Sequence, residues 1–179
     1  MKKLTTIIGV CTLAVAMSFT SCKEAKKEGA KQENDAKDES SKKEMAMKAT
    51  FKSSETAAVF QHYIHLKTAL TNSDATEAKS GAAMLVTALG ESNEEVKVLA
   101  ASIAEENDLE GQRKLFSNLT EKMQTILSGA LASGEIYKQF CPMAFNNTGG
   151  YWFSNSKEIK NPYYGAKMLK CGTIKETLQ

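Results

Sequence analysis

Residues 54–70 read SETAAVFQHYIHLKTAL, and they open the part of the chain that follows a helical period. The apolar side chains of Val59, Tyr63, Leu66 and Leu70 recur at spacings of three and four residues. Side chains at these spacings lie on one face of an α-helix. The stretch therefore predicts an amphipathic helix whose apolar face must pack against another element.

Three further segments repeat this pattern towards the C-terminus. A break at residues 72–74 separates the first helix from a second one, which continues to Gly90. A third helix begins at residues 92–95, where acidic side chains favour a helix N-terminus, and a fourth spans residues 109–132. Short connections between four amphipathic helices predict an antiparallel four-helix bundle. The apolar faces of the three later helices comprise Ala78, Ala82, Leu85, Leu89, Val96, Leu99, Ala100, Ile103, Leu115, Phe116, Leu119, Met123, Ile126 and Leu127.

The composition changes after Gly134, where aromatic residues, glycine and asparagine replace the helical pattern. Residues 135–140 and 172–178 are candidate strands, and Gly149-Gly150 and residues 161–165 are turn signals. We expect a loop-rich β excursion that packs on the helices. The predicted fold is therefore mainly α, with one folded domain over residues 53–179.

The first 22 residues are typical of a bacterial lipoprotein leader. Lys2 and Lys3 precede an apolar stretch at residues 4–19, which is too short for a permanent membrane helix. The leader ends in SFTSC, which resembles the lipobox of lipoprotein signal peptides, so we expect cleavage of residues 1–21 and lipidation of Cys22. Plain secretion with cleavage elsewhere is the alternative. Lipidation would anchor the protein to a membrane of the cell envelope, facing the periplasm.

Residues 22–52 are expected to form a charged tether. Between residues 23 and 48 there are eight lysines and seven acidic residues, with no aromatic or branched apolar side chain. Such a segment buries too little apolar area to offset the entropy of ordering, so we expect disorder. The net charge of the whole chain is only +2 and there is no basic stripe, which disfavours nucleic-acid binding.

Two short motifs in the C-terminal segment contain sulfur ligands. Cys141 and Met143 flank a proline, so both side chains can turn to one side of a loop. Met168 and Cys171 are three residues apart, which is one helical turn. Four soft sulfur donors favour Cu(I) or a similarly soft ion, and metal binding lowers the pKa of a thiol ligand. The motifs indicate a copper site.

The same two cysteines are candidates for a disulfide. Cys11 leaves with the leader and Cys22 would carry lipid, so Cys141 and Cys171 are the remaining pair in an oxidising compartment. A disulfide across this separation would stabilise the fold by roughly 3–4 kcal/mol. From the spacing alone, a metal site and a disulfide are equally favoured.

His62 and His65 are three residues apart on the first predicted helix and therefore lie on one side of it. They are either polar surface residues, which the spacing alone favours, or imidazole ligands that join the sulfur atoms if this helix packs beside the loop. Two cysteines, two histidines and a methionine are also the ligands of binuclear, thiolate-bridged copper centres. We therefore retain both histidines as candidate metal ligands.

Several stretches together resemble a known domain family. These are FCPMAF at residues 140–145, Trp152, IKNPYYG at 159–165 and MLKCG at 168–172, and the likeness extends to YIHLKTAL at 63–70. The family is uncharacterised and occurs alone in small lipoproteins and at the C-terminus of periplasmic adaptor subunits of copper and silver efflux pumps. The resemblance covers roughly residues 55–178. It implies heavy-metal handling, with efflux adaptor or pump components as partners.

The sequence therefore predicts a membrane-anchored, extracytoplasmic protein that binds copper and acts in metal homeostasis or efflux. The alternative is a helical protein-interaction module, stapled by a disulfide and free of metal. An enzyme is not expected, because no Ser/His/Asp arrangement, paired carboxylates or Cys-x-x-Cys motif is found in the sequence. Copper and silver remain equally acceptable to this donor set.

Overall fold

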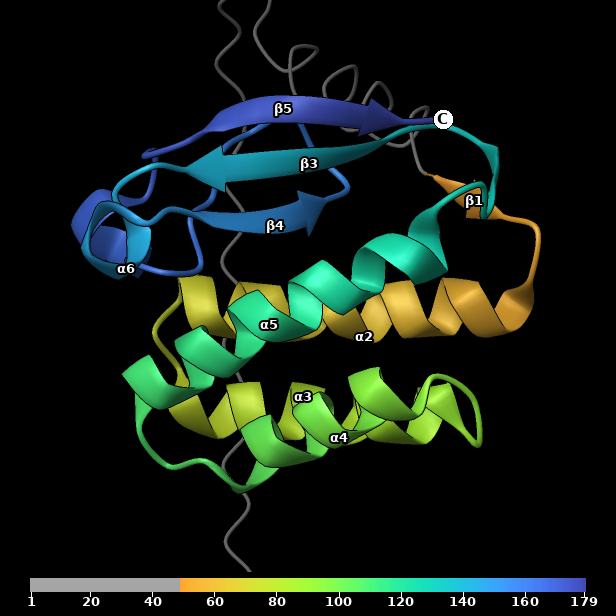
Figure 1. The fold of residues 1–179 in the computed structure, drawn as a ribbon, viewed down its shortest axis with the longest axis horizontal. Helices are drawn as coiled ribbons and strands as arrows, with labels where there is room; N and C mark the ends of the chain where they lie inside the picture. The colour runs from red at the N-terminus through yellow and green to blue at the C-terminus, as the bar shows by residue number, and fades with distance from the viewer. Residues whose placement is uncertain (1–48) are drawn as a thin grey trace, which may run out of the picture. The chain divides into compact units, whose positions relative to one another are not determined.

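The computed structural model describes residues 49–179 (Figure 1). The predicted signal peptide at 1–21, the lipidated Cys22 and most of the predicted tether lie outside the described residues. Within the described range, no helix is long and apolar enough to cross a membrane.

Four long helices make up most of the described chain, and the mainly α prediction is confirmed. They are α2 (Ser54–Thr71), α3 (Ala75–Leu89), α4 (Glu94–Glu105) and α5 (Leu109–Leu127). Three of them begin at a polar side chain that accepts a hydrogen bond from the first turn, as N-caps do. These caps are Ser53, Asp74 and Asp108.

The helices bury the apolar faces that the sequence predicts. Each helix packs on the next one along the chain, and α2 also contacts α5. In Figure 1, α3 and α4 lie on the side of α2 and α5 that faces away from the three-stranded sheet. The fully buried side chains at the centre include Tyr63, Leu66, Leu70, Leu85, Leu89, Ile103, Phe116, Leu119, Met123 and Leu127.

The fourth helix ends earlier than predicted. It was expected to continue to residue 132, but α5 ends at Leu127, and Gly129 adopts a positive φ of 66°. Glycine adopts this conformation without steric cost and commonly ends helices. The chain then forms strand β2 (Leu131–Ser133), whose Leu131 is buried. Leu131, two residues after Gly129, therefore belongs to strand β2 and not to the apolar face of α5.

The folded part also begins slightly earlier than predicted. Strand β1 (Thr50–Phe51) lies within the range expected as tether and pairs with β2 in antiparallel fashion. The Phe51 and Phe60 ring centroids are 5.3 Å apart, and the Lys52 backbone N–H donates to the Ala130 carbonyl at 2.9 Å. Phe51 is an aromatic residue, a type that is absent from the sequence of residues 23–48.

A three-stranded antiparallel sheet follows the helices. Its strands are β3 (Ile136–Cys141), β4 (Gly150–Ser154) and β5 (Thr173–Leu178), in the order β4-β3-β5. Between them lie the short helix α6 (Ala144–Asn147) and the 3-10 turn η1 (Gly165–Met168). The predicted β excursion is therefore confirmed, and its aromatic run at residues 151–153 is the strand β4.

The sheet is attached to the helices through β4. The buried Tyr63 hydroxyl lies 2.8 Å from Thr120 Oγ1 on α5 and accepts the Phe153 backbone N–H of β4 at 3.0 Å. One side chain of α2 thereby connects both α5 and the sheet. Trp152 and Phe153 are fully buried on the two sides of β4, as core aromatic residues, whereas Tyr151 is exposed.

Candidate metal centre

The two cysteines of the C-terminal segment meet in space. Cys141 ends β3 and is fully buried, while Cys171 precedes β5 and is half-buried. Their sulfur atoms are 2.8 Å apart, and both are free thiols. The pairing of β3 with both β4 and β5 brings together two positions that are 30 residues apart in sequence.

A buried asparagine holds the loop that carries Cys171. Asn161 is completely buried, and its Nδ2 donates to the Cys171 carbonyl at 2.9 Å. Its Oδ1 accepts the backbone N–H groups of Tyr163 at 2.8 Å and Tyr164 at 3.3 Å. Its backbone N–H donates to the Leu169 carbonyl at 2.9 Å. An asparagine that bonds the backbone two residues later forms an Asx turn, and here the same side chain also holds the thiol loop.

The other motif is held by the same turn. The Tyr164 hydroxyl donates to the Met143 carbonyl at 2.7 Å, so one tyrosine links the residues after Cys141 to the turn at Asn161. Within α6, Phe145, Asn146 and Asn147 all have positive φ, between 52° and 69°. Non-glycine residues in this conformation cost roughly 1–2 kcal/mol each. This strain lies next to the thiol pair, where the surrounding contacts keep the backbone in one conformation.

The chain is tightly packed immediately after Cys171. Gly172 follows it, and a Cβ atom at this position would lie 2.8 Å from the Trp152 ring and 3.1 Å from the Phe140 carbonyl. A larger residue at this position would displace the loop, because these distances are shorter than ordinary contacts. The chain therefore packs the residue after the thiol against the only tryptophan in the sequence.

The Cys171 thiol favours its proton at neutral pH. The hydrogen bond to Cys141, followed by burial and the charge of the Cys141 thiolate, raises the pKa of Cys171 to about 11. A backbone hydrogen bond from Met143 opposes this rise. Any ligand that binds both sulfur atoms as thiolates must therefore displace protons, as a strongly bound metal ion does.

The two methionines of the motifs are more exposed than Cys141. Met143 is two residues after Cys141 and its side chain is 45% exposed. Met168 is half-buried at the end of η1, where its carbonyl accepts the Cys171 backbone N–H at 3.0 Å. Each thiol therefore has one thioether near it in the chain, since the exposed Met143 follows the buried Cys141 and the half-buried Met168 precedes the half-buried Cys171.

The histidines lie elsewhere. His65 Nε2 is 2.5 Å from Glu77 Oε1 on α3, so its ring pairs with a neighbouring helix. His62 is half-buried on the same helix. Across residues 49–179, no group of three or more His, Cys, Asp and Glu side chains is placed to hold a metal ion. The structure therefore does not bring either histidine to the thiols.

Asn161, Tyr164 and Arg113 were not among the predicted site residues. The Arg113 guanidinium is buried and donates to the Pro162 carbonyl at 2.9 Å, to the Leu70 carbonyl at 3.1 Å and to Ser73 Oγ at 3.0 Å. It thereby fixes the Asn161 turn to the end of α2. The sequence NPYYG at residues 161–165 indicated Asn161 and Tyr164 only as parts of a turn. Nothing in the sequence indicates that Arg113 is buried.

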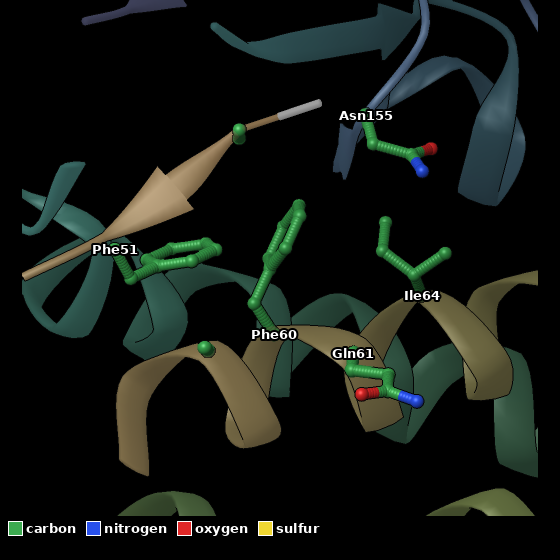
Figure 2. Close-up of a pocket in the computed structure, with 7 residues that line it drawn as sticks. Phe51, Phe60, Gln61, Ile64 and Asn155 are labelled. Carbon is green, nitrogen blue, oxygen red and sulfur yellow. The ribbon is translucent and has the colours of Figure 1, made fainter. Parts of the chain in front are cut away.

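A groove of about 420 Å³ lies between β1, α2 and the loop after β4 (Figure 2). Phe51, Phe60 and Ile64 form its apolar walls, and Gln61 and Asn155 lie at its polar edges. It contains neither the cysteines nor the methionines of the two motifs. The groove is therefore separate from the candidate metal centre.

The comparisons with known proteins concern the helical part. No curated protein and no solved structure matches the chain. The match to a family model begins in α2, runs through α3, α4 and α5, and ends in β2, before both cysteine motifs. Residues 59–133 contain a domain of the uncharacterised family described as "Protein of unknown function (DUF3347)".

Proposed function

We propose that this protein binds one Cu(I) ion, or a similarly soft ion such as Ag(I), through the thiolates of Cys141 and Cys171. Met143 and Met168 supply thioether ligands that complete or tune the site. The four helices, arranged as an antiparallel bundle, act as the rigid support of the sheet and its loops.

The separation of the two sulfur atoms is the observation that carries this proposal. Thiols from positions 30 residues apart lie 2.8 Å from each other, inside a loop arrangement that buries one of them. A metal–thiolate bond is about 2.3 Å long, so two thiolates on one ion are roughly 4 Å apart. Binding therefore requires the pair to open by about 1 Å. The half-buried Cys171, on the loop before β5, is the residue that moves.

The donor chemistry determines which ion is favoured. Thiolate and thioether sulfur are soft ligands, and they select Cu(I) over the harder divalent ions. The raised pKa of Cys171 adds a second filter, because only an ion with high thiolate affinity displaces the protons at neutral pH. The pair should therefore discriminate strongly against Mg²⁺ and Ca²⁺.

Copper retention by the full chain tests the proposal. The purified protein is loaded with Cu(I) under anaerobic, reducing conditions and then titrated with a chromophoric Cu(I) chelator. We expect one tightly held ion, lost in the Cys141→Ser/Cys171→Ser variant and retained in a Cys22→Ser control. Unchanged retention in the double cysteine variant would refute the proposal.

Two further variants assign the remaining ligands. Met143→Leu/Met168→Leu should weaken Cu(I) binding while keeping the stoichiometry, and Met84→Leu is the matched control, because Met84 is similarly exposed (43%) on α3. His62→Asn/His65→Asn should leave the affinity unchanged. A loss of copper in the histidine variant would favour the binuclear centre instead.

The same sulfur separation also favours a second function. Oxidation of Cys141 and Cys171 to a disulfide would staple β3 to the loop before β5 and stabilise the fold by about 3 kcal/mol. The protein would then be a metal-free interaction module. Thiol titration under denaturing conditions distinguishes the two, since two free thiols from Cys141 and Cys171 in the native preparation contradict the stapled form.

We further propose that the protein is a lipoprotein of the cell envelope, anchored through Cys22 and facing the periplasm, and that it exchanges metal with efflux adaptor or pump components. The leader and its SFTSC sequence support this location. The Cys22→Ser variant should leave the membrane fraction, and its retention there would contradict the anchor.

A further inference from the structure

We propose that Asn161 is the positioning residue of the thiol pair. Its carboxamide fixes the carbonyl of Cys171 and thereby holds the Cys171 sulfur against Cys141. This deepens the proposed metal site and rests on it for the copper readout, but the thiol readout below is independent of metal.

The Asn161 side chain uses its two ends for different tasks. Its Oδ1 accepts the N–H groups of Tyr163 and Tyr164, which forms the turn. Its Nδ2 donates across the loop to the Cys171 carbonyl at 2.9 Å. The acceptor end therefore shapes residues 161–164, while the donor end sets where Cys171 lies.

The other contacts of this loop lie on either side of the Cys171 carbonyl. The Cys171 N–H donates to the Met168 carbonyl, within the same short turn. Gly172 packs against Trp152 and the Phe140 carbonyl, and the following edge strand β5 pairs with β3. Those contacts locate the neighbours of Cys171, whereas the buried Asn161 bonds the Cys171 carbonyl itself.

Asn161 itself is tied to the helices. The next residue is Pro162, whose carbonyl accepts the Arg113 guanidinium of α5 at 2.9 Å. Arg113 also bonds the Leu70 carbonyl at the end of α2. Buried hydrogen bonds therefore connect two helices to the turn, and the partly buried bond from Asn161 continues this connection to Cys171. A group held in this way keeps one position, so the Cys171 backbone stays in place while its sulfur atom moves by the roughly 1 Å that binding requires.

Asn161→Asp separates the two tasks of the side chain. Aspartate keeps an oxygen for the N–H groups of Tyr163 and Tyr164 but places a second oxygen against the Cys171 carbonyl. The buried carboxyl should have a raised pKa, because burial disfavours its charged form. Once protonated at about pH 5, it can donate a hydrogen bond to that carbonyl again. A positioning role therefore predicts a pH-dependent defect.

The first readout is the thiol–disulfide equilibrium of Cys141 and Cys171 in the full chain, with Cys11 and Cys22 replaced by serine. One oxidised glutathione takes two electrons from the pair, the two sulfur atoms join, and two reduced glutathione molecules leave with the protons. At about pH 7.5, Asn161→Asp should lower this equilibrium constant about tenfold, the ratio expected for one lost hydrogen bond. The constant should recover towards the wild-type value at about pH 5.

Two comparison variants accompany this test. Tyr137→Phe removes the hydrogen bond to Glu135 at the start of β3 and leaves Asn161 and its turn intact, so its thiol equilibrium should match that of the wild type. Asn161→Ser retains a hydroxyl for the turn but is too short to reach the Cys171 carbonyl. It should show the same tenfold loss without recovery at low pH. It also keeps the test available if Asn161→Asp folds poorly at neutral pH.

Cu(I) affinity is the second readout and should fall in parallel in both Asn161 variants. The inference would be overturned if Asn161→Asp and Asn161→Ser both had the thiol equilibrium constant and the Cu(I) affinity of the wild type. A protein that retains no copper but shows the pH-dependent thiol defect would support the positioning role and refute only the proposed metal site.

Discussion

The helical region, residues 54–133, carries eleven acidic and six basic side chains, whereas the C-terminal region, residues 134–179, carries three acidic and six basic ones. The two regions also differ in how they are held together. Apolar side chains at helical spacing stabilise the first region. The second contains both described cysteines, and buried polar side chains such as Asn161 and Gln139 connect its loops.

Under the proposed function, the helical region is the support and the C-terminal region contains the metal ligands. The family match covers the helical region and stops before the thiol motifs. A packed apolar face tolerates many side chains of similar volume, whereas a hydrogen bond to one carbonyl requires a donor at one position. Substitutions in the first region should therefore change stability, and substitutions in the second should change the geometry of the thiols.

The largest effect is expected at the junction of the two regions. Arg113→Met leaves the Leu70 and Pro162 carbonyls and the Ser73 hydroxyl without their buried donor. Such a loss should lower the free energy of unfolding by about 4 kcal/mol. Equilibrium unfolding in urea measures this change. The thiol equilibrium should shift as well, because Pro162 follows Asn161.

Lys114→Met is the matched control for Arg113→Met, since Lys114 is the next residue on α5 and is exposed. It should change the free energy of unfolding by less than about 0.5 kcal/mol. If Arg113→Met also cost less than about 1 kcal/mol, the guanidinium would not join the two regions.

A smaller effect, confined to one region, is expected in the helical core. Leu85→Ala removes a fully buried side chain of α3 and should cost about 3 kcal/mol. Met84→Ala on the same helix should cost far less, because that side chain is 43% exposed. Urea unfolding measures both, and the Cu(I) affinity of either folded variant should equal that of the wild type. A changed Cu(I) affinity in Leu85→Ala would contradict the proposal that the helical region only supports the metal site.

The sequence predicted the helical region well because one signal, apolar spacing, sets its structure. The spacing failed at the end of α5, where Leu131 continues the apolar series but follows the turn at Gly129. Helical spacing alone does not show where a glycine redirects the chain. The first folded residues were missed for a similar reason, since Phe51 is a single aromatic residue beside a charged segment.

The candidate site was predictable only in part. The sequence grouped Cys141 with Cys171 by their donor type, and the structure brings their sulfur atoms together. The spacing of His62 and His65 could not reveal that α2 turns His65 towards Glu77. The role of Asn161 could not be predicted either, because its hydrogen bond to Cys171 depends on tertiary structure that no local pattern encodes.

The smallest effect concerns Lys67, a helical residue that lies under the C-terminal loop. Burial, reinforced by Lys160 and opposed by Glu158, lowers the pKa of Lys67 to about 8. Below that pH the Lys67 amine is charged in both the folded and the unfolded state. The folded state then bears the full free-energy cost of burying that charge. Between about pH 8 and the unfolded value of 10.5, the unfolded chain binds a proton that the folded one has lost. Wild-type stability therefore gains from Lys67 as the pH rises through this window.

Lys67→Met keeps the apolar stem and removes the amine. At pH 7 it should raise the free energy of unfolding by about 1–2 kcal/mol, since a buried charge is replaced by an apolar group. The advantage should shrink towards pH 10, where the wild-type amine is neutral. Urea unfolding of both proteins between pH 7 and 10 measures this difference, because every other titratable group is common to both proteins. A stability difference that is constant across this range, or a destabilised variant at pH 7, would show that the Lys67 amine is not held at a cost beneath the loop of residues 158–160.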